Sequence, residues 1–147
     1  MRRFFIVTAF LAAASMLAAC AEDKMMAKKE ASLYDRLGGK PAITAVVDQF
    51  VANIAADNRI NQRFAKTDIP KLKGHLVDQI CSATGGPCKY AGRDMVTTHK
   101  GMKITDAEFN WTGAHLAAAL DKFAVPAKEK NELLTAIGSM QPQIVGQ

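Results

Sequence analysis

Apolar side chains recur at intervals of three and four residues along most of the chain, which is the spacing of one face of an α-helix. No stretch alternates apolar and polar side chains with a period of two, as a half-buried strand would. The pattern therefore predicts an all-α domain over residues 32–147. Its clearest stripe comprises Ile43, Val46, Val47, Phe50, Val51 and Ile54.

Capping and turn-forming residues divide the pattern into helices. Gly38 and Gly39 end a first short helix, and Pro41 suits the first position of the next one. Asp68 suits an N-cap, and Gly85 and Gly86 break the helix that follows it. The last two stripes carry Phe109, Leu116, Ala119, Leu120 and Phe123, then Leu133, Leu134 and Ile137. The predicted helices are residues 32–37, 41–56, 68–83, 105–124 and 126 to about 140, and residues 94–102 carry only a short stripe that Gly101 stops.

The first 19 residues have the features of an export signal. Arg2 and Arg3 precede an apolar run of about thirteen residues, which is too short to span a bilayer. The sequence Leu17-Ala18-Ala19-Cys20 resembles a bacterial lipoprotein signal, which implies cleavage before Cys20 and a lipid on that residue. A plain secretory signal cleaved near Ala19 is the alternative. Residues 20–31 are polar and unpatterned, as in a flexible tether. We expect a periplasmic protein held by its lipid, and the resemblance favours the outer membrane.

Charge and cysteine content narrow the function classes. The formal charge of +5 falls to +3 once Arg2 and Arg3 are removed, and no basic run is present. Nucleic-acid binding is therefore not expected. Cys81 and Cys88 remain as an even pair, either free or joined in a disulfide, and a compartment outside the cytoplasm favours the disulfide.

Two of the three histidines lie on apolar helical stripes. His75 shares its stripe with Leu72, Leu76, Gln79 and Ile80, and His99 shares a short one with Met95 and Met102. Each alone is an ordinary core histidine as readily as a ligand. Two facing apolar stripes that each carry an imidazole suit a haem, whose iron takes an axial nitrogen. No Cys-x-x-Cys-His sequence is present, so the haem would be non-covalent. His115 lies off its stripe and is expected at the surface.

Four motifs, in order, resemble those of the group 1 truncated haemoglobins. The resemblance covers nearly the whole of residues 32–145. It implies a shortened globin fold, a two-over-two helical sandwich around haem b with its iron. The motifs are Ser32-Leu33-Tyr34-Asp35-Arg36-Leu37-Gly38-Gly39, Phe64, Gly85-Gly86-Pro87 with Tyr90-Ala91-Gly92-Arg93, and Thr98-His99-Lys100-Gly101-Met102-Lys103-Ile104-Thr105.

The resemblance also implies roles for individual residues. His99 corresponds to the proximal ligand of the iron, and Phe64 to the aromatic ring that packs on the porphyrin. Met102, on the His99 stripe, is a further candidate contact. The distal helix brings Leu72, His75, Leu76 and Gln79 over the other face. Candidates for the haem propionates are Tyr90, Lys71 and Lys73.

The sequence departs from the family pattern on the distal side. Val51 stands where a tyrosine usually donates a hydrogen bond to bound oxygen, and Leu76 stands where a glutamine is common. Gln79 lies one turn further along. His75 matches the position of a second axial ligand in some relatives. Either His75 binds the iron and external ligands displace it, or His75 bonds to a propionate or solvent and the iron is five-coordinate.

These features leave three functions open. The first is binding of a diatomic gas, O2, CO or NO, at the haem iron. The second is a six-coordinate redox or electron-transfer haemoprotein. Enzymatic turnover, including nitric oxide detoxification, would need an external reductase because the chain has no room for a flavin domain. The third is a haem-free helical lipoprotein that binds a partner.

Overall fold

The computed structural model describes residues 30–147, so the predicted signal segment, Cys20 and nearly all of the predicted tether lie outside the described residues. The described part of the chain is helical, and its one β-type contact is an isolated bridge between Ile104 and Val145. The predicted all-α fold class is therefore confirmed. The elements are α1 Leu33–Arg36, α2 Gly39–Ala56, η1 Asn61–Phe64, α3 Ile69–Ala83, α4 Met95–His99, α5 Asp106–Lys122, α6 Ala127–Gly138 and η2 Gln141–Gln143.

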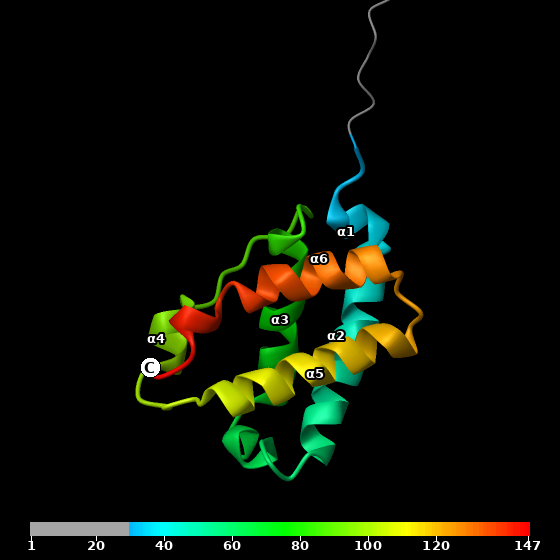
Figure 1. The fold of residues 1–147 in the computed structure, drawn as a ribbon. Helices are drawn as coiled ribbons and strands as arrows, with labels where there is room; N and C mark the ends of the chain where they lie inside the picture. The colour runs from blue at the N-terminus through cyan, green and yellow to red at the C-terminus, as the bar shows by residue number, and fades with distance from the viewer. Residues whose placement is uncertain (1–29) are drawn as a thin grey trace, which may run out of the picture.

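The long helices form two pairs that cross each other. Helix α2 packs against both α3 and α5, and α5 packs against α6. In Figure 1, α5 and α6 lie across α2 and α3, with the short α4 at the left edge. The buried core lies where the pairs meet, so each long helix buries one stripe and leaves its other faces for solvent or a ligand. The core residues are Ile43, Val46, Val47, Phe50, Val51, Ile54, Ile60, Val77, Ile80, Cys81, Leu116, Ala119, Leu120 and Leu133.

Side-chain caps fix where several helices begin. Ser32 with Asp35, and Thr105 with Glu108, form capping boxes in which each side chain bonds to the other's backbone amide. Asp68 accepts a hydrogen bond from the Lys71 amide at 3.0 Å, as its predicted N-cap role requires. These caps satisfy amide groups that the first helical turn leaves without partners.

The structure corrects two details of the predicted pattern. Helix α2 begins at Gly39 rather than at Pro41, because Gly38 adopts a left-handed conformation with φ of +93° and turns the chain directly into the helix. Pro41 still lies in the first turn, where its missing amide hydrogen costs nothing. Phe123 was expected in the core stripe of α5, but it is 45% exposed because it caps the end of the helix. The short helix η1 was not predicted.

The C-terminal residues close the loop that follows α4. The Gly146 amide donates to the Ile104 carbonyl at 2.9 Å, and the Lys103 amide donates to the Gln147 carbonyl at 2.6 Å. Among residues 30–147, no helix combines the length and hydrophobicity needed to cross a bilayer.

Candidate functional site

His99 is the last residue of α4 and is half-buried. Asp94 starts this helix by accepting a hydrogen bond from the Thr97 amide at 2.8 Å. The Nδ1 atom of His99 lies 2.8 Å from the main-chain carbonyl oxygen of Met95. A carbonyl oxygen only accepts hydrogen bonds, so Nδ1 carries the proton. In the neutral imidazole the lone pair then lies on Nε2, which is the tautomer that a metal-binding imidazole needs.

Helix α3 presents two faces with different surroundings. Val77, Ile80 and Cys81 are buried among the core residues. The predicted distal residues, in contrast, are all half-buried rather than enclosed: Leu72, His75, Leu76 and Gln79. The ring of His75 lies against that of Tyr90, with 6.1 Å between ring centroids and an angle of 72° between planes. The predicted distal side chains therefore lie outside the sealed core, where a ligand could reach them.

Gln79 links α3 directly to the helix of His99. Its Nε2 atom lies 3.4 Å from Sδ of Met95 and 3.5 Å from Sδ of Met140. The amide of Gln79 and the thioether of Met95 thus join the predicted distal and proximal helices, and the thioether of Met140 adds the segment after α6. Sequence reasoning did not anticipate the part played by Met140, because it follows α6 and is far from Gln79 in the chain.

Tyr90 lies on the segment between α3 and α4. Its hydroxyl donates to the Arg93 carbonyl at 2.9 Å, and a Cβ atom at Gly92 would collide with its phenol ring. Burial raises the pKa of the Tyr90 hydroxyl above its ordinary value. As a protonated donor already engaged with Arg93, Tyr90 shapes the rim of the site beside His75.

A disulfide ties this segment to α3. Cys81 and Cys88 are bonded, with an S–S distance of 2.08 Å. Gly86, inside the closed loop, is wedged between the disulfide and the ring of Tyr34, where a Cβ atom would lie 2.7 Å from Sγ of Cys81. The disulfide that the sequence favoured is therefore present, and it anchors the chain two residues before Tyr90.

The remaining predicted haem contacts, Val51, Phe64 and Met102, differ in how deeply they are buried. Val51 is only 6% exposed and belongs to the core stripe of α2. Phe64 ends η1 and packs, half-buried, against that core. Met102 is 41% exposed, and its carbonyl accepts a hydrogen bond from Nη1 of Arg63 at 3.0 Å. Phe64 thus packs against the core, whereas Met102 is exposed to solvent.

The two lysines proposed to bind the haem propionates differ in their accessibility. Lys71 is exposed, whereas Nζ of Lys73 forms an ion pair with Asp48 of α2 at 2.9 Å. Lys71 is therefore the more accessible of the two cations on this helix.

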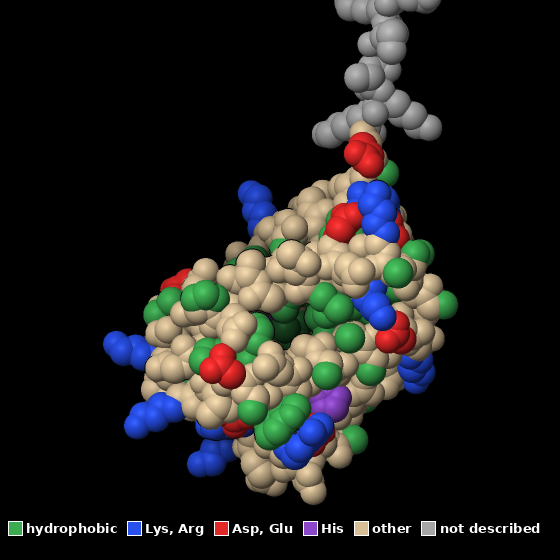
Figure 2. All heavy atoms as spheres, in the orientation of Figure 1, with side chains coloured by type: hydrophobic (Ala, Val, Ile, Leu, Met, Phe, Trp, Pro, Cys, Tyr) green, Lys and Arg blue, Asp and Glu red, His purple; other side chains and the backbone are tan. Residues whose placement is uncertain are grey.

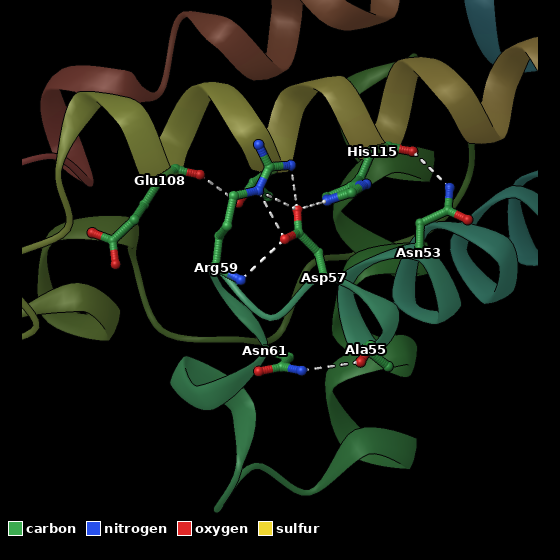
Figure 3. A network of polar contacts seen from close by, with 8 residues as sticks. Asn53, Ala55, Asp57, Arg59, Asn61, Glu108 and His115 are labelled. Atoms are coloured by element: carbon green, nitrogen blue, oxygen red, sulfur yellow. Dashed lines mark hydrogen bonds and ion pairs between the residues drawn. The ribbon is translucent and has the colours of Figure 1, made fainter.

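His115 was expected at the surface, and the structure corrects that expectation. Its side chain is 19% exposed, and Nε2 lies 2.7 Å from Oδ2 of Asp57 (Figure 3). Arg59 bonds to the same carboxylate and also stacks over Trp111, 4.7 Å from the ring centroid. The Arg59 guanidinium holds the pKa of Asp57 well below its usual value. This network joins the end of α2 to α5, and neither His75 nor His99 takes part in it.

Comparison with known proteins identifies similar chains. The model of the bacterial-like globin family matches residues 32–145. A group 1 truncated haemoglobin from Mycolicibacterium paratuberculosis is 39% identical over 114 residues, which cover 78% of this chain and 84% of that protein. The Fe(III) crystal structure of truncated haemoglobin from Tetrahymena pyriformis matches with a TM-score of 0.77 and 30% identity, covering 80% of this chain and 100% of that one.

A second similar structure contains haem. The 2/2 haemoglobin from Synechococcus, in the cyanomet state with covalently attached haem, matches with a TM-score of 0.71 and 33% identity. The match covers 77% of this chain and 95% of that one. Likeness in sequence and in fold thus extends over the whole described helical domain.

Proposed function

Because the chain belongs to the bacterial-like globin family, as a group 1 truncated haemoglobin, we propose that it binds a diatomic gas at a haem iron held by His99. The cofactor of such a globin is haem b. The observation that carries the proposal is the hydrogen bond from Nδ1 of His99 to the Met95 carbonyl, which leaves Nε2 free to bind a metal. When bound, haem supplies an iron that takes small ligands such as O2, CO and NO.

Half-buried apolar side chains on α3 and η1 suit a flat apolar cofactor. Leu72 and Leu76 offer aliphatic surface on α3, and Phe64 offers an aromatic wall at the end of η1. Their partial exposure suits side chains that would complete their burial against a porphyrin. His99 would hold the iron from α4, and Lys71 would be available to a propionate at the edge.

The distal side has few groups able to donate a hydrogen bond to a bound gas. Val51 and Leu76 are aliphatic, and the amide of Gln79 is engaged with two sulfur atoms. His75 is the imidazole among the distal residues of α3. We therefore infer that His75 competes for the sixth position of the iron and that external ligands displace it. Strong stabilisation of bound O2 is not expected from these side chains.

Absorption spectra of the purified protein test this function. We expect a Soret band after addition of haem, a ferric spectrum of low-spin type, and a shift when the reduced protein binds CO. Absence of any Soret band would instead support a haem-free helical lipoprotein. Stoichiometric haem binding without any response to CO, NO or O2 would contradict gas binding.

A variant of His99 tests the ligand assignment. His99→Ala should lose nearly all haem because no other α4 side chain supplies a nitrogen at that place. Added imidazole should restore part of the binding by occupying the vacated position. Full haem retention without imidazole would contradict the assignment, and His115→Ala serves as the control with wild-type haem content.

Electron transfer is the second candidate function. The lack of hydrogen-bond donors at Val51 and Leu76 favours a protein that does not hold O2 firmly. A permanently closed sixth position would give reversible reduction with slow CO binding, whereas a gas-binding protein would bind CO quickly. Nitric oxide detoxification or another redox reaction catalysed by the protein would need an external reductase.

We also propose that the protein is exported as a lipoprotein anchored through Cys20. The support is the sequence of residues 1–20 together with the Cys81–Cys88 disulfide, which suits a compartment outside the cytoplasm. Labelled palmitate should enter the wild-type chain and be absent from Cys20→Ser. Equal labelling of both chains would contradict the anchor.

A further inference from the structure

The turn between α5 and α6 is unusually apolar for an exposed segment. Five consecutive residues, Phe123-Ala124-Val125-Pro126-Ala127, carry no polar side chain. Phe123 is 45% exposed, and Ala124, Pro126 and Ala127 are also exposed. Single exposed apolar residues are common, but a contiguous apolar turn around an exposed aromatic ring is typical of an interaction site.

The backbone holds this turn in one shape. The Ala124 amide donates to the Asp121 carbonyl at 2.9 Å, and the Val125 amide donates to the Leu120 carbonyl at 3.1 Å. Beneath the turn lies an apolar pocket between α2, α5 and α6, lined in part by Phe123, Val125 and Leu133. Figure 2 shows green side chains in the hollow between α5 and α6. The turn therefore has a fixed conformation and presents apolar side chains to solvent.

The N-terminal tether leaves the domain close to this turn. Nε of Arg36, in α1, lies 3.0 Å from Glu129, which is in the first turn of α6. Leu37, directly after α1, lines the same apolar pocket as Phe123. Residues 20–31 span at most about 40 Å when fully extended. A lipid on Cys20 would therefore keep the α1 end of the domain, and the turn with it, near the bilayer.

The charges beside the turn suit an anionic surface. The neighbouring acidic side chains are paired with cations: Asp121 with Lys130 at 2.6 Å, and Glu129 and Glu132 with Arg36. Lys122 and Lys128 are exposed on either side of the turn, and neither forms a salt bridge within the described residues; Nζ of Lys122 donates to the neutral Oε1 of Gln49 at 2.5 Å. Lysines beside an apolar segment bind anionic lipid headgroups while the apolar side chains enter the interface.

We propose that the α5–α6 turn docks on the membrane surface, with Phe123 inserted among the lipids and Lys122 and Lys128 against anionic headgroups. This orientation rests on the proposed anchor at Cys20. The anchor brings the turn to the bilayer, and the turn then fixes which side of the domain faces it. Attachment through the same molecule makes even a weak surface affinity effective.

Flotation with lipid vesicles tests the turn separately from the anchor. The mature, haem-loaded chain with Cys20→Ser carries no lipid and is mixed with vesicles of phosphatidylethanolamine and phosphatidylglycerol. We expect measurable binding, reduced at least about fivefold by Phe123→Ser. Val96→Ser is the matched control, because Val96 is 43% exposed on α4, and it should bind as wild type does. Lys122→Glu with Lys128→Glu should weaken binding to these vesicles more than to neutral phosphatidylcholine.

Several outcomes would overturn the proposal. One is no vesicle binding by the unlipidated chain, and another is an equal loss with Phe123→Ser and Val96→Ser. If Phe123→Ser instead abolishes self-association in sedimentation without vesicles, the turn is an interface between copies of the chain. Far-ultraviolet circular dichroism and the Soret band confirm that each variant is folded. Palmitate labelling reports on the anchor alone, so failure of the anchor and failure of the docking surface are distinguishable.

Discussion

The imidazole of His75 lies edge-on against the ring of Tyr90, with 6.1 Å between the ring centroids. This contact joins the distal face of α3 to the segment that leads into α4 and His99. Movement of His75 toward or away from an iron would therefore change its contact with Tyr90 and, through Tyr90, affect the loop that the Cys81–Cys88 disulfide holds.

Replacement of His75 by leucine should change the coordination of the iron. We expect His75→Leu to convert a low-spin ferric spectrum to a high-spin one. CO should also bind the reduced variant at least about tenfold faster, because no internal ligand has to leave first. Absorption spectra and stopped-flow mixing measure both effects. His115→Leu, which removes an imidazole bonded to Asp57 instead, is the matched control. A low-spin spectrum that survives in His75→Leu would remove His75 from the iron.

Loss of the disulfide should lower stability. The bond closes a short loop, and the chain-entropy relation gives a contribution of roughly 2.5 kcal/mol to the free energy of unfolding. Cys81→Ala with Cys88→Ala should therefore unfold at a lower urea concentration than wild type. The variant should also release haem faster, because the segment that leads to Tyr90 and α4 loses its anchor. Unchanged urea midpoints under oxidising conditions would count against this role.

An added methyl group at Gly86 should be poorly tolerated. A Cβ atom there would lie 2.7 Å from both Sγ of Cys81 and Cγ of Tyr34. We expect Gly86→Ala to reduce the free energy of unfolding by about 1–3 kcal/mol through overpacking. Gly113→Ala is the control, because a Cβ atom at that position in α5 meets nothing within 4 Å. It should be neutral or stabilising, by up to about 1 kcal/mol. Urea titrations followed by circular dichroism compare the two.

The ion pair of Glu108 predicts a specific pH dependence. The side-chain hydrogen bond from Arg63 and the amide of Thr105 lower the pKa of Glu108 from 4.5 to about 2. Because the folded-state pKa is below the unfolded one, the stabilisation is complete above pH 4.5 and is lost as the pH falls toward 2. Glu108→Gln should therefore be less stable than wild type at pH 6, and the difference should narrow by pH 3. A constant difference at the two pH values would contradict this account.

Much of the fold follows from local rules that the sequence displays. The spacing of apolar residues and the capping residues predict the long helices, because both signals act over short stretches of sequence. Asp68 caps α3, which begins at the next residue, and the apolar stripe of α2 repeats every three to four residues. Phe123 shows the limit of this reasoning. A helical period places it on the core face of α5, but the helix ends there and the side chain is left 45% exposed.

In the candidate site, too, contacts within one helix can be predicted from the sequence, whereas contacts between distant segments cannot. His99 was predicted from its stripe and from the family motif, and its hydrogen bond to Met95 is local to one helical turn. The contacts of Gln79 with Met95 and Met140 join three segments far apart in the chain, so no local pattern encodes them. The bond from His115 to Asp57 was missed for the same reason, since only the packing of α2 on α5 brings the two side chains together.

The pairing of Ile104 with Val145 has a consequence for how the protein matures. The loop after His99 is closed by residues 145–147, which lie far from it in the sequence. Until these residues fold back, the backbone on the far side of this histidine is not held in place. Stable capture of the prosthetic group should therefore require residues 145–147 to be docked on this loop.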